Sequence, residues 1–254
     1  MGQNKRIRIL DVPVDMVNNK QAMEIFEGLM ELPGCSLIVT PNSEIIMNAT
    51  KDTELKMLIE EAGLIIPDGI GLVYASKIIK EPLSERVTGV DFLNSILAYL
   101  EKTGKSIYLL GSKPANAESA SVAELAAQNM QIKYPNLKIA GTHDGYFKKE
   151  EEAALVDEIN ESGAEFLCVA LGAPKQEKFI YEHRDEFKHV CAGIGVGGSL
   201  DVWAGTVKRA PKFYQDHGLE WLYRFVKEPS RYKRMAQLPL FMVKVLTTAK
   251  NSSV

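Results

Sequence analysis

The sequence predicts an α/β protein, with a Rossmann-like, mostly parallel sheet covered by helices on both faces and a basic helical segment at its C-terminal end. Three observations carry this prediction. Short apolar runs alternate with stretches of helical spacing from residue 7 to residue 194, which is typical of strands joined by crossover helices. Most of these runs are apolar almost throughout, as expected for strands buried on both faces. Residues 205–254 break the alternation and show no strand pattern.

The predicted strands and helices follow each other in regular order. The strands are Ile7–Leu10, Ser36–Thr40, Leu64–Ile66, Ser106–Leu110, Leu137–Ala140, Phe166–Ala170 and His189–Ile194. The helices between them are Asn19–Met30, Ser43–Ala62, Thr88–Lys102, Ala115–Lys133, Lys149–Glu161 and Lys175–Glu186. Within Thr88–Lys102 the apolar residues recur at spacings of three and four, which places them on one face of a helix.

The C-terminal region is predicted to be helical, basic and aromatic. Trp221 lies within an amphipathic helix whose apolar positions are Leu219, Leu222, Phe225 and Val226. Pro229 should end this helix, a second short helix should carry Arg231, Lys233 and Arg234, and Pro239 should interrupt the chain again. We therefore divide the chain into an α/β domain, residues 1–204, and a basic amphipathic helical appendage, residues 205–254.

The charges are distributed unevenly over these two parts. The 254 residues are 46% hydrophobic and 25% charged, as in an ordinary globular protein. Residues 1–204 contain 20 Lys and Arg against 30 Asp and Glu, a net charge of −10, whereas residues 205–254 contain 10 against 3, a net charge of +7. A basic tail on an acidic body favours an anionic partner, such as phosphates, nucleic acid or an anionic membrane. The alternative is a solvated pair of basic helices.

Other sequence signals point to a cytoplasmic protein. Residues 1–6 lead directly into the first strand without a signal peptide, and no run of 18 apolar residues is present to span a bilayer. Cys35, Cys168 and Cys191 are widely spaced in apolar surroundings, so we expect reduced core thiols and neither a disulfide nor a zinc site.

Candidate site residues lie directly after the predicted strands. Ligands of open parallel sheets bind outside the carboxyl ends of the strands, and five strand ends here combine glycines with polar side chains. Glycines let the backbone approach a ligand, and free N–H groups at the start of a helix suit an anion such as a pyrophosphate. The five segments are Thr40–Glu44, Pro67–Gly71, Gly111–Pro114, Gly172–Glu177 and Gly195–Asp201.

Each segment taken alone is also consistent with ordinary turn and N-cap chemistry. Asp68, for example, could cap the helix that follows it. A glycine-rich dinucleotide fingerprint at the first strand and a phosphate-binding Gly-Lys-Ser/Thr loop are both missing. No Asp-x-Asp pair follows a strand, which argues against a metal-bridged diphosphate, and the four histidines lack metal-ligand spacing. Five such segments converging on one sheet edge nevertheless favour a binding site.

The motifs together resemble the WecG/TagA/CpsF family of glycosyltransferases, in order, from about residue 7 to residue 235. The combination is specific, although a single motif would not be. One departure lies at Gly198-Ser-Leu-Asp201, where many members have Gly-Ala-Phe-Asp; the carboxylate is kept. The matching segments are Pro67–Gly71, Arg86–Gly89, Gly172–Glu177, Gly195–Gly198, Lys208–Pro211 and Gly218–Arg224.

The resemblance is strongest to the branch that transfers N-acetylmannosamine in wall teichoic acid synthesis. It implies an inverting transfer from UDP-N-acetylmannosamine to the 4-hydroxyl of N-acetylglucosamine on undecaprenyl diphosphate, giving a β1,4 linkage. Asp68 matches the family's proposed catalytic base. The matching substrate-binding residues are Thr40, Asn42, Arg86 and Gln176.

The resemblance also implies how UDP is held without a metal ion or a cofactor. Asp201 and Tyr146 would hold uridine by hydrogen bonding and stacking. Further UDP contacts are expected from Gly111, Gly172, Pro174, Lys175 and Gly197. Cations must then neutralise the diphosphate, and planar guanidinium groups suit phosphate. The available guanidinium groups in the tail are Arg224, Arg231 and Arg234.

The expected partners are a UDP-sugar, the undecaprenyl-linked acceptor and the membrane surface, which the tail would contact at the inner face of the cell membrane; nucleic acid is not expected. The apolar face of the tail helix offers a second use, as a contact between subunits of a homo-oligomer. Three alternatives stay open: a uronic-acid or other UDP-hexose donor, a non-enzymatic nucleotide-binding protein that docks on membranes, and a nucleotide-dependent oxidoreductase.

Overall fold

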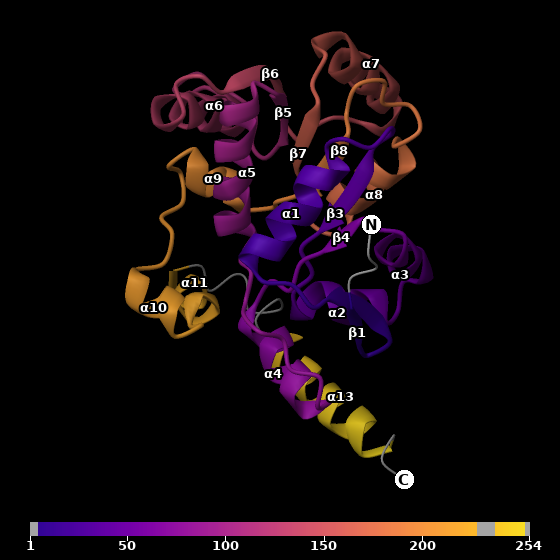
Figure 1. Ribbon diagram of the computed structural model, residues 1–254. Helices are drawn as coiled ribbons and strands as arrows, with labels where there is room; N and C mark the ends of the chain where they lie inside the picture. Colours follow the sequence, from indigo (N-terminus) through magenta and orange to yellow (C-terminus); the bar gives the residue numbers. More distant parts are fainter. Residues whose placement is uncertain (1–4, 228–236, 252–254) are drawn as a thin grey trace.

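The computed structural model describes residues 5–227 and 237–251. Its centre is a six-stranded parallel sheet with the order β4-β3-β8-β7-β5-β6 (Figure 1), which confirms the predicted α/β fold. The strands are β3 (Ser36–Val39), β4 (Leu64–Ile65), β5 (Ser106–Gly111), β6 (Lys138–His143), β7 (Phe166–Ala170) and β8 (Ala192–Gly195).

The first predicted strand does not join this sheet, and that expectation was wrong. Strand β1 (Arg6–Ile9) instead pairs antiparallel with β2 (Val12–Asp15) in a separate two-stranded sheet. Leu10 and Asp11 connect the two strands with positive φ angles of 52° and 64°. Two such residues in succession form the tight turn of a β-hairpin, which returns the chain antiparallel to itself.

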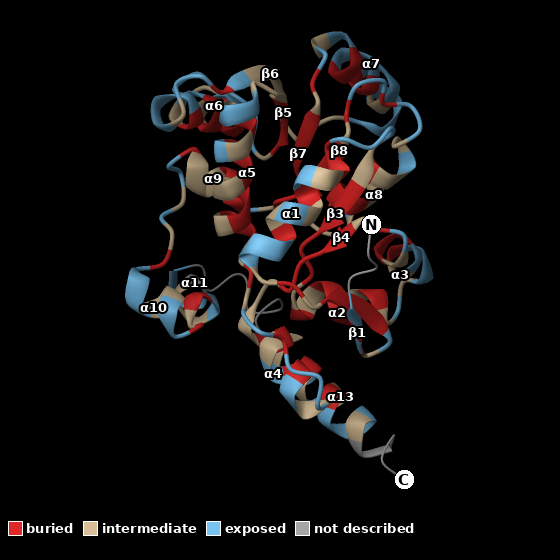
Figure 2. Ribbon diagram, viewed as in Figure 1, coloured by how far each residue is buried: buried red, intermediate tan, exposed pale blue. Residues whose placement is uncertain are grey.

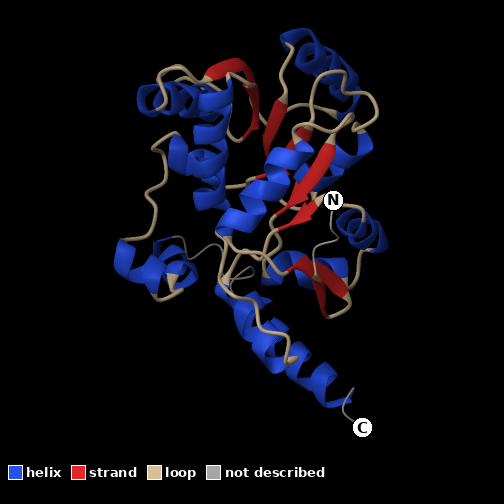
Figure 3. Cartoon of the chain, viewed as in Figure 1, coloured by secondary structure: helices blue, strands red, loops and turns tan. Residues whose placement is uncertain are grey.

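The sheet is covered on both faces, as its apolar strands predicted. In β7, Leu167 and Val169 face one hydrophobic core, whereas Phe166, Cys168 and Ala170 face the other. Figure 2 shows the buried strands at the centre of the molecule, and Figure 3 shows the helices packed around them. Because both faces are dry, the sheet edge at the carboxyl ends of the strands is the natural place for polar chemistry.

The helices largely follow the predicted positions, with several different boundaries. Their bounds are α1 Asn19–Leu29, α2 Ser43–Ala49, α3 Thr53–Glu60, α4 Ile70–Ile78, α5 Gly89–Thr103, α6 Val122–Lys133, α7 Glu152–Ser162, α8 Lys175–Glu182, α9 Ser199–Trp203, α10 Lys212–Asp216, α11 Glu220–Lys227 and α13 Gln237–Asn251. A short 3₁₀ turn, Lys149–Glu151, precedes α7. Helices α9 and α10 were not predicted, and α4 was anticipated only as the helix that Asp68 could cap.

Capping explains the two largest boundary changes. The single helix predicted over Ser43–Ala62 is two helices, because the Asp52 side chain accepts a hydrogen bond from Leu55 N at 3.0 Å and so begins α3. The helix predicted from Ala115 begins only at Val122, where Ser121 and Glu124 form a reciprocal capping box. Both boundaries are therefore determined by local hydrogen bonds.

The tail contributes to the core at one place. Helix α13 packs beside α2 and α4 (Figure 1), and its Phe241 and Val245 are 0% and 1% exposed within one of the two main hydrophobic cores. Pro239 does not interrupt α13, which corrects our expectation, since proline is tolerated in the first turn of a helix. The predicted helix with Arg231, Lys233 and Arg234 lies outside the described residues, and the two-domain division stays a prediction.

Two further expectations concern membranes and cysteines. Across residues 5–227 and 237–251, no helix is long and apolar enough to cross a bilayer. All three cysteines are free; Cys168 is buried, whereas Cys35 and Cys191 are half-buried rather than in the core. Burial raises the pKa of the Cys168 thiol to about 12 and so keeps it protonated.

The packing of α13 predicts its contribution to stability. We expect Phe241→Ala to lower the free energy of unfolding by about 3–5 kcal/mol, because it removes a fully buried aromatic side chain from the core. Leu240→Ala, at a neighbouring position that is 56% exposed, is the matched control. Urea unfolding measures both, and equal effects of the two variants would show that α13 does not share the core.

Candidate active site

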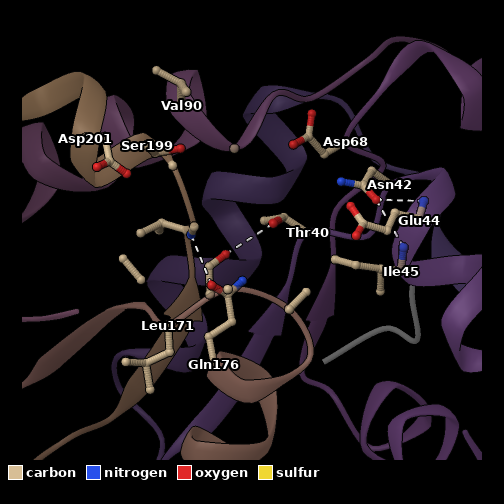
Figure 4. A pocket seen from close by; sticks show the side chains of 18 of the residues that line it. Thr40, Asn42, Glu44, Ile45, Asp68, Val90, Leu171, Gln176, Ser199 and Asp201 are labelled. Carbon is tan, nitrogen blue, oxygen red and sulfur yellow. Dashed lines mark hydrogen bonds between the residues drawn. The ribbon is translucent and has the colours of Figure 1, made fainter. Parts of the chain in front are cut away.

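A cleft of about 980 Å³ lies at the carboxyl ends of the parallel strands. Residues that follow β3, β4, β5, β6, β7 and β8 line its walls, together with residues of α4, α5 and α11. Five of the strand-end segments predicted from the sequence therefore meet at one place. Figure 4 shows side chains from these separate segments around the same cleft.

One end of the cleft gathers Asp68, Thr40 and Asn42. Asp68 follows β4, and its side chain is 28% exposed. A Cβ atom added to Gly89 would lie 3.5 Å from Asp68 Oδ2 and 3.8 Å from Thr40 Oγ1, so both oxygens face the same small space. Asn42 caps α2 by accepting hydrogen bonds from Glu44 N at 2.9 Å and Ile45 N at 3.1 Å.

Asp68 does not occupy the N-cap position of the helix that follows it. Gly69, which has no side chain, occupies the N-cap position of α4, and no side-chain cap hydrogen bond is present there. The carboxylate instead lies at the cleft wall within 4.0 Å of the Arg86 guanidinium, measured from Nε to Oδ1. This position beside a cation and next to a void is typical of a functional carboxylate.

Gln176 connects this end of the cleft to the glycine-rich loop after β8. Its Oε1 accepts a hydrogen bond from Gly197 N at 3.1 Å, and its Nε2 donates to Glu177 at 2.8 Å. Gln176 is 4% exposed, and a side chain at Gly195 would collide with its amide. Thr40 also reaches this loop, donating its hydroxyl to Gly195 O at 3.2 Å (Figure 4). The two side chains therefore hold the Gly195–Gly197 backbone in place.

The other end of the cleft centres on Asp201. Ser112, at the end of β5, donates its hydroxyl to Asp201 Oδ1 at 2.9 Å. Tyr146 lies nearby on the loop after β6 and is 72% exposed, so its ring is free to contact a bound molecule. The lysines that line the cleft are Lys113, Lys148 and Lys175, of which only Lys175 was a predicted site residue.

The structure brings most predicted site residues to the cleft, but not all of them. The predicted residues that line it are Thr40, Asn42, Asp68, Arg86, Tyr146, Gly172, Lys175, Gln176, Gly197 and Asp201. Gly111 and Pro174 do not line it. Gly111 has a φ of 128°, and a Cβ there would lie 2.5 Å from Ala170 O, so this glycine supports the close approach of β5 and β7. Pro174 occupies the N-cap position of α8.

The tail arginines cannot be placed at the cleft. Arg224 belongs to α11, but its side chain is not among the described ones, and Arg231 and Arg234 lie outside the described residues. Three other tail residues line the cleft, namely Glu220 and Trp221 of α11 and Leu238 of α13. The motif Gly218–Arg224 indicated that this segment belongs to the site. No sequence pattern, however, indicated that Glu220 would be buried rather than exposed to solvent.

A chain of partly buried charges joins the cleft to the tail. Arg86 lies between Asp68 and Glu220, and it donates Nη2 to the Glu220 carboxylate. Arg209 approaches the same carboxylate at 3.6 Å and forms two hydrogen bonds with Asp91 at 2.7 and 2.8 Å. The paired Arg209 guanidinium lowers the pKa of Asp91, and Asp91 in turn raises the pKa of Arg209.

A possible metal site lies away from the cleft. Within the described chain, Glu152, Glu182 and His183 are the group whose oxygen and nitrogen atoms come within 4.8 Å of one another. Lys149 Nζ already contacts Glu152 at 2.6 Å and Glu182 at 3.1 Å, which supplies their positive partner. None of these residues is among those that line the cleft.

Comparison with known proteins agrees with the geometry. Residues 7–253 match the Glycosyl transferase WecG/TagA/CpsF family. Relatives named N-acetylglucosaminyldiphosphoundecaprenol N-acetyl-beta-D-mannosaminyltransferase occur in three bacteria. In Bacillus spizizenii the identity is 37% over 86% of this chain and 81% of the relative, and in Bacillus subtilis it is 37% over 85% and 81%. In Staphylococcus aureus it is 36% over 94% of this chain and 92% of the relative.

The buried Glu177 predicts an unusual pH dependence of stability. Burial raises the pKa of Glu177, which is fully buried and whose Oε2 has no hydrogen-bond partner among the described residues. Its folded pKa therefore lies above the unfolded value of about 4.3, so native stability falls as pH rises through the window between the two. Glu177→Gln keeps an acceptor for Gln176 but does not titrate.

We expect the free energy of unfolding of Glu177→Gln, relative to the wild type, to increase from pH 4 to pH 7. Urea unfolding at a series of pH values measures this difference, and Glu161→Gln on an exposed position of α7 is the matched control for loss of a carboxylate. A difference that stays constant or decreases with pH would contradict the assignment of Glu177 as a carboxyl group whose pKa is raised by folding.

Proposed function

Because this chain belongs to the Glycosyl transferase WecG/TagA/CpsF family, we propose that it transfers N-acetylmannosamine from UDP-N-acetylmannosamine to the 4-hydroxyl of the N-acetylglucosamine on undecaprenyl diphosphate. The names of its relatives in Bacillus and Staphylococcus support this acceptor and this sugar. The reaction would supply the linkage unit of a teichoic acid. The observation that carries the proposal is the placement of Asp68 in a cleft whose opposite end holds Asp201.

The cleft has the size and the polarity that two substrates require. Its volume of about 980 Å³ is at the upper end of ordinary ligand sites, which accommodates a nucleotide sugar together with an acceptor sugar. Polar side chains and glycines both line it, and the glycines leave the backbone accessible to a ligand. This lining suits a donor bound at the Asp201 end and an acceptor bound at the Asp68 end.

Asp68 is the general base of the proposed reaction. It removes the proton from the acceptor 4-hydroxyl while that oxygen attacks the anomeric carbon of N-acetylmannosamine. The new C–O bond forms as the bond from the anomeric carbon to the UDP oxygen breaks, and UDP leaves with the electron pair. A single displacement inverts the anomeric carbon, converting an α donor into a β1,4 product. Thr40, Asn42, Arg86 and Gln176 would position the acceptor.

The donor is held mainly by the strand ends around Asp201. Asp201 and Tyr146 would bind uridine, while Gly172, Gly197 and Lys175 would lie along the diphosphate. Gly111 and Pro174 would act indirectly, through the strand and helix that they position. Cations then neutralise the departing diphosphate. We assign this role to Arg224, Arg231 and Arg234, with Lys113 and Lys148 of the cleft wall beside them.

The tail would also hold the enzyme at the inner face of the membrane. Its net charge of +7 suits an anionic lipid surface, where each Lys or Arg contributes about 1 kcal/mol. Leu240, Val243 and Leu246 add an exposed apolar face on α13. A protein whose acceptor is a lipid gains from this position, because the acceptor sugar is presented there. The competing use of such a face, packing between copies of the chain, would give a homo-oligomer.

The base assignment predicts a loss of turnover without a loss of donor binding. We expect Asp68→Asn to lower kcat by about 10²-fold or more, because general-base catalysis contributes on that scale. Its affinity for UDP should stay close to that of the wild type. UDP release with a panel of UDP-hexose and UDP-hexuronic acid donors and a lipid-linked acceptor measures kcat, and titration calorimetry measures UDP binding.

Asp157→Asn, on an exposed position of α7, is the matched control for Asp68→Asn. Full turnover by a folded Asp68→Asn protein would exclude Asp68 as the base. Wild-type protein that binds UDP but transfers no sugar from any donor would instead contradict the proposed function and favour a nucleotide-binding protein.

The diphosphate assignment predicts that transfer needs no divalent ion. EDTA should leave the rate nearly unchanged, because arginine and lysine side chains supply the positive charge that a metal would otherwise bring. Initial rates with EDTA, with EDTA plus excess Mg²⁺ and without either addition measure this. Strong inhibition that Mg²⁺ reverses would contradict the assignment.

A further inference from the structure

Ser112 follows β5 directly, lines the cleft and has an unusual backbone conformation. Its φ angle is 62°, in the left-handed region that residues with a side chain rarely adopt. Such a conformation costs free energy, so it persists only where surrounding contacts hold it, and it is frequent at functional sites. In the described part of the chain, three other non-glycine residues have a positive φ, and none of them lines the cleft: Leu10, Asp11 and Lys80.

The backbone of Ser112 joins two neighbouring strand ends. Its N–H donates to Ala170 O, at the end of β7, at 3.0 Å, and its carbonyl accepts from Gly145 N at 2.9 Å. Gly145 belongs to the loop after β6 and packs so closely that a Cβ there would lie 3.0 Å from Ser112 N. Tyr146 comes next in this loop, and its N–H donates to Asp144 Oδ1 at 2.8 Å. The Ser112 carbonyl therefore fixes the backbone that carries the exposed Tyr146 ring.

The side chain of Ser112 reaches a third strand end. Its hydroxyl donates to Asp201 Oδ1 at 2.9 Å. The backbone of Asp201 is held separately, because its carbonyl accepts from Thr206 N at 3.1 Å and from Val207 N at 3.2 Å, so Ser112 acts on the carboxylate alone. Among the described residues, the second oxygen, Oδ2, has no hydrogen-bond or ion-pair partner, and it lies 3.9 Å from the place where a Cβ of Gly198 would be. That oxygen is available to accept from a bound molecule.

We propose that Ser112 is a positioning residue of the nucleotide site, which places Tyr146 through its carbonyl and orients the Asp201 carboxylate through its hydroxyl. This inference rests on the proposed binding of uridine by Tyr146 and Asp201. An aromatic ring and a carboxylate that are hydrogen-bonded through one residue keep a constant spacing. A nucleoside can then stack on the ring while one of its donor groups reaches Oδ2. A site that is ordered before the ligand arrives binds it with a smaller entropic cost.

The left-handed conformation of Ser112 allows its effect on binding to be separated from its effect on stability. Glycine adopts positive φ angles about as readily as negative ones, whereas alanine is strained there as serine is. Glycine and alanine both lack the hydroxyl. The two substitutions should therefore differ in stability and agree in their effect on the nucleotide site.

The test compares Ser112→Gly and Ser112→Ala with the wild type in full-length protein. We expect both variants to raise the Kd of UDP by about tenfold, because hydrogen bonds to charged groups contribute on that scale. Ser112→Gly should melt about 2 °C above Ser112→Ala, since it alone relieves the backbone. With saturating UDP-sugar, kcat should stay within about twofold of the wild type, because the contact is the same in the bound substrate and the transition state. Titration calorimetry, thermal unfolding and UDP release measure the three quantities.

A double-mutant cycle with Asp201 tests whether the hydroxyl acts through the carboxylate. In an Asp201→Ala background, Ser112→Ala should raise the Kd of UDP by less than about twofold more. Lys80→Gly, at an exposed position with a φ of 63° outside the cleft, is the control for relief of the backbone and should leave the Kd unchanged. Ser84→Ala, also at an exposed position outside the cleft, is the control for loss of a hydroxyl.

Three results would overturn the role of Ser112. The first is wild-type UDP affinity in both folded variants. The second is near-wild-type affinity in Ser112→Gly with weak binding only in Ser112→Ala, because binding would then follow stability rather than the hydroxyl. The third is additive effects in the cycle with Asp201. Unchanged UDP affinity in Asp201→Ala would instead contradict the donor end of the cleft together with this inference, and wild-type protein that does not bind UDP would remove the proposed function itself.

Discussion

The ion-pair chain that runs from Asp68 through Arg86, Glu220 and Arg209 to Asp91 connects the parts of this molecule that have to act together. Its members come from the loop after β4, the loop before α5, α5 itself, the start of the tail and α11. Buried ion pairs contribute little net stability, because desolvation offsets most of their attraction. Such pairs instead fix the positions of the side chains, because leaving one partner unpaired destabilises the protein. In this structure the chain of charges holds the start of α11 against the cleft wall.

The parallel sheet restricts where this chain of charges can lie. Because all six strands run parallel, their carboxyl ends meet at one edge. Both faces of the sheet are filled by apolar side chains, so polar groups such as Thr40, Gln176 and Asp201 are confined to that edge. Hydrogen bonds that join Thr40 and Gln176 to the Gly195–Gly197 backbone then connect the Asp68 end of the cleft to the loop that leads to Asp201.

The position of the cleft at the carboxyl ends of the strands could be predicted from the sequence, because the residues that indicate it are close together in the chain. Apolar runs identified the strands, and the polar residues directly after them could be assigned to the site without knowing the fold in detail. Arg86 and Tyr146, which follow no simple strand-end pattern, could be assigned only through resemblance to a family. Most of these residues line the cleft, whereas Gly111 and Pro174 support it from behind.

The remaining features depend on contacts that no local pattern records. The turn at Leu10 and Asp11 contains neither glycine nor asparagine, so the first hairpin was mistaken for a sheet strand. Helix α13 is held by the burial of Phe241 against distant helices, and Pro239 lies in its first turn, where proline is tolerated. The pairing of Arg86 with Glu220 joins residues far apart in the chain. A single sequence contains no information about such a pair.

An experimental structure of the full-length protein with UDP and a soluble N-acetylglucosamine diphosphate acceptor analogue tests the central claim most directly. The account predicts uridine beside Asp201, Arg86 bonded to Glu220, and the acceptor 4-hydroxyl within about 3 Å of an Asp68 oxygen, the distance that proton transfer requires. Uridine bound away from Asp201, or an acceptor hydroxyl directed at another side chain, would contradict it.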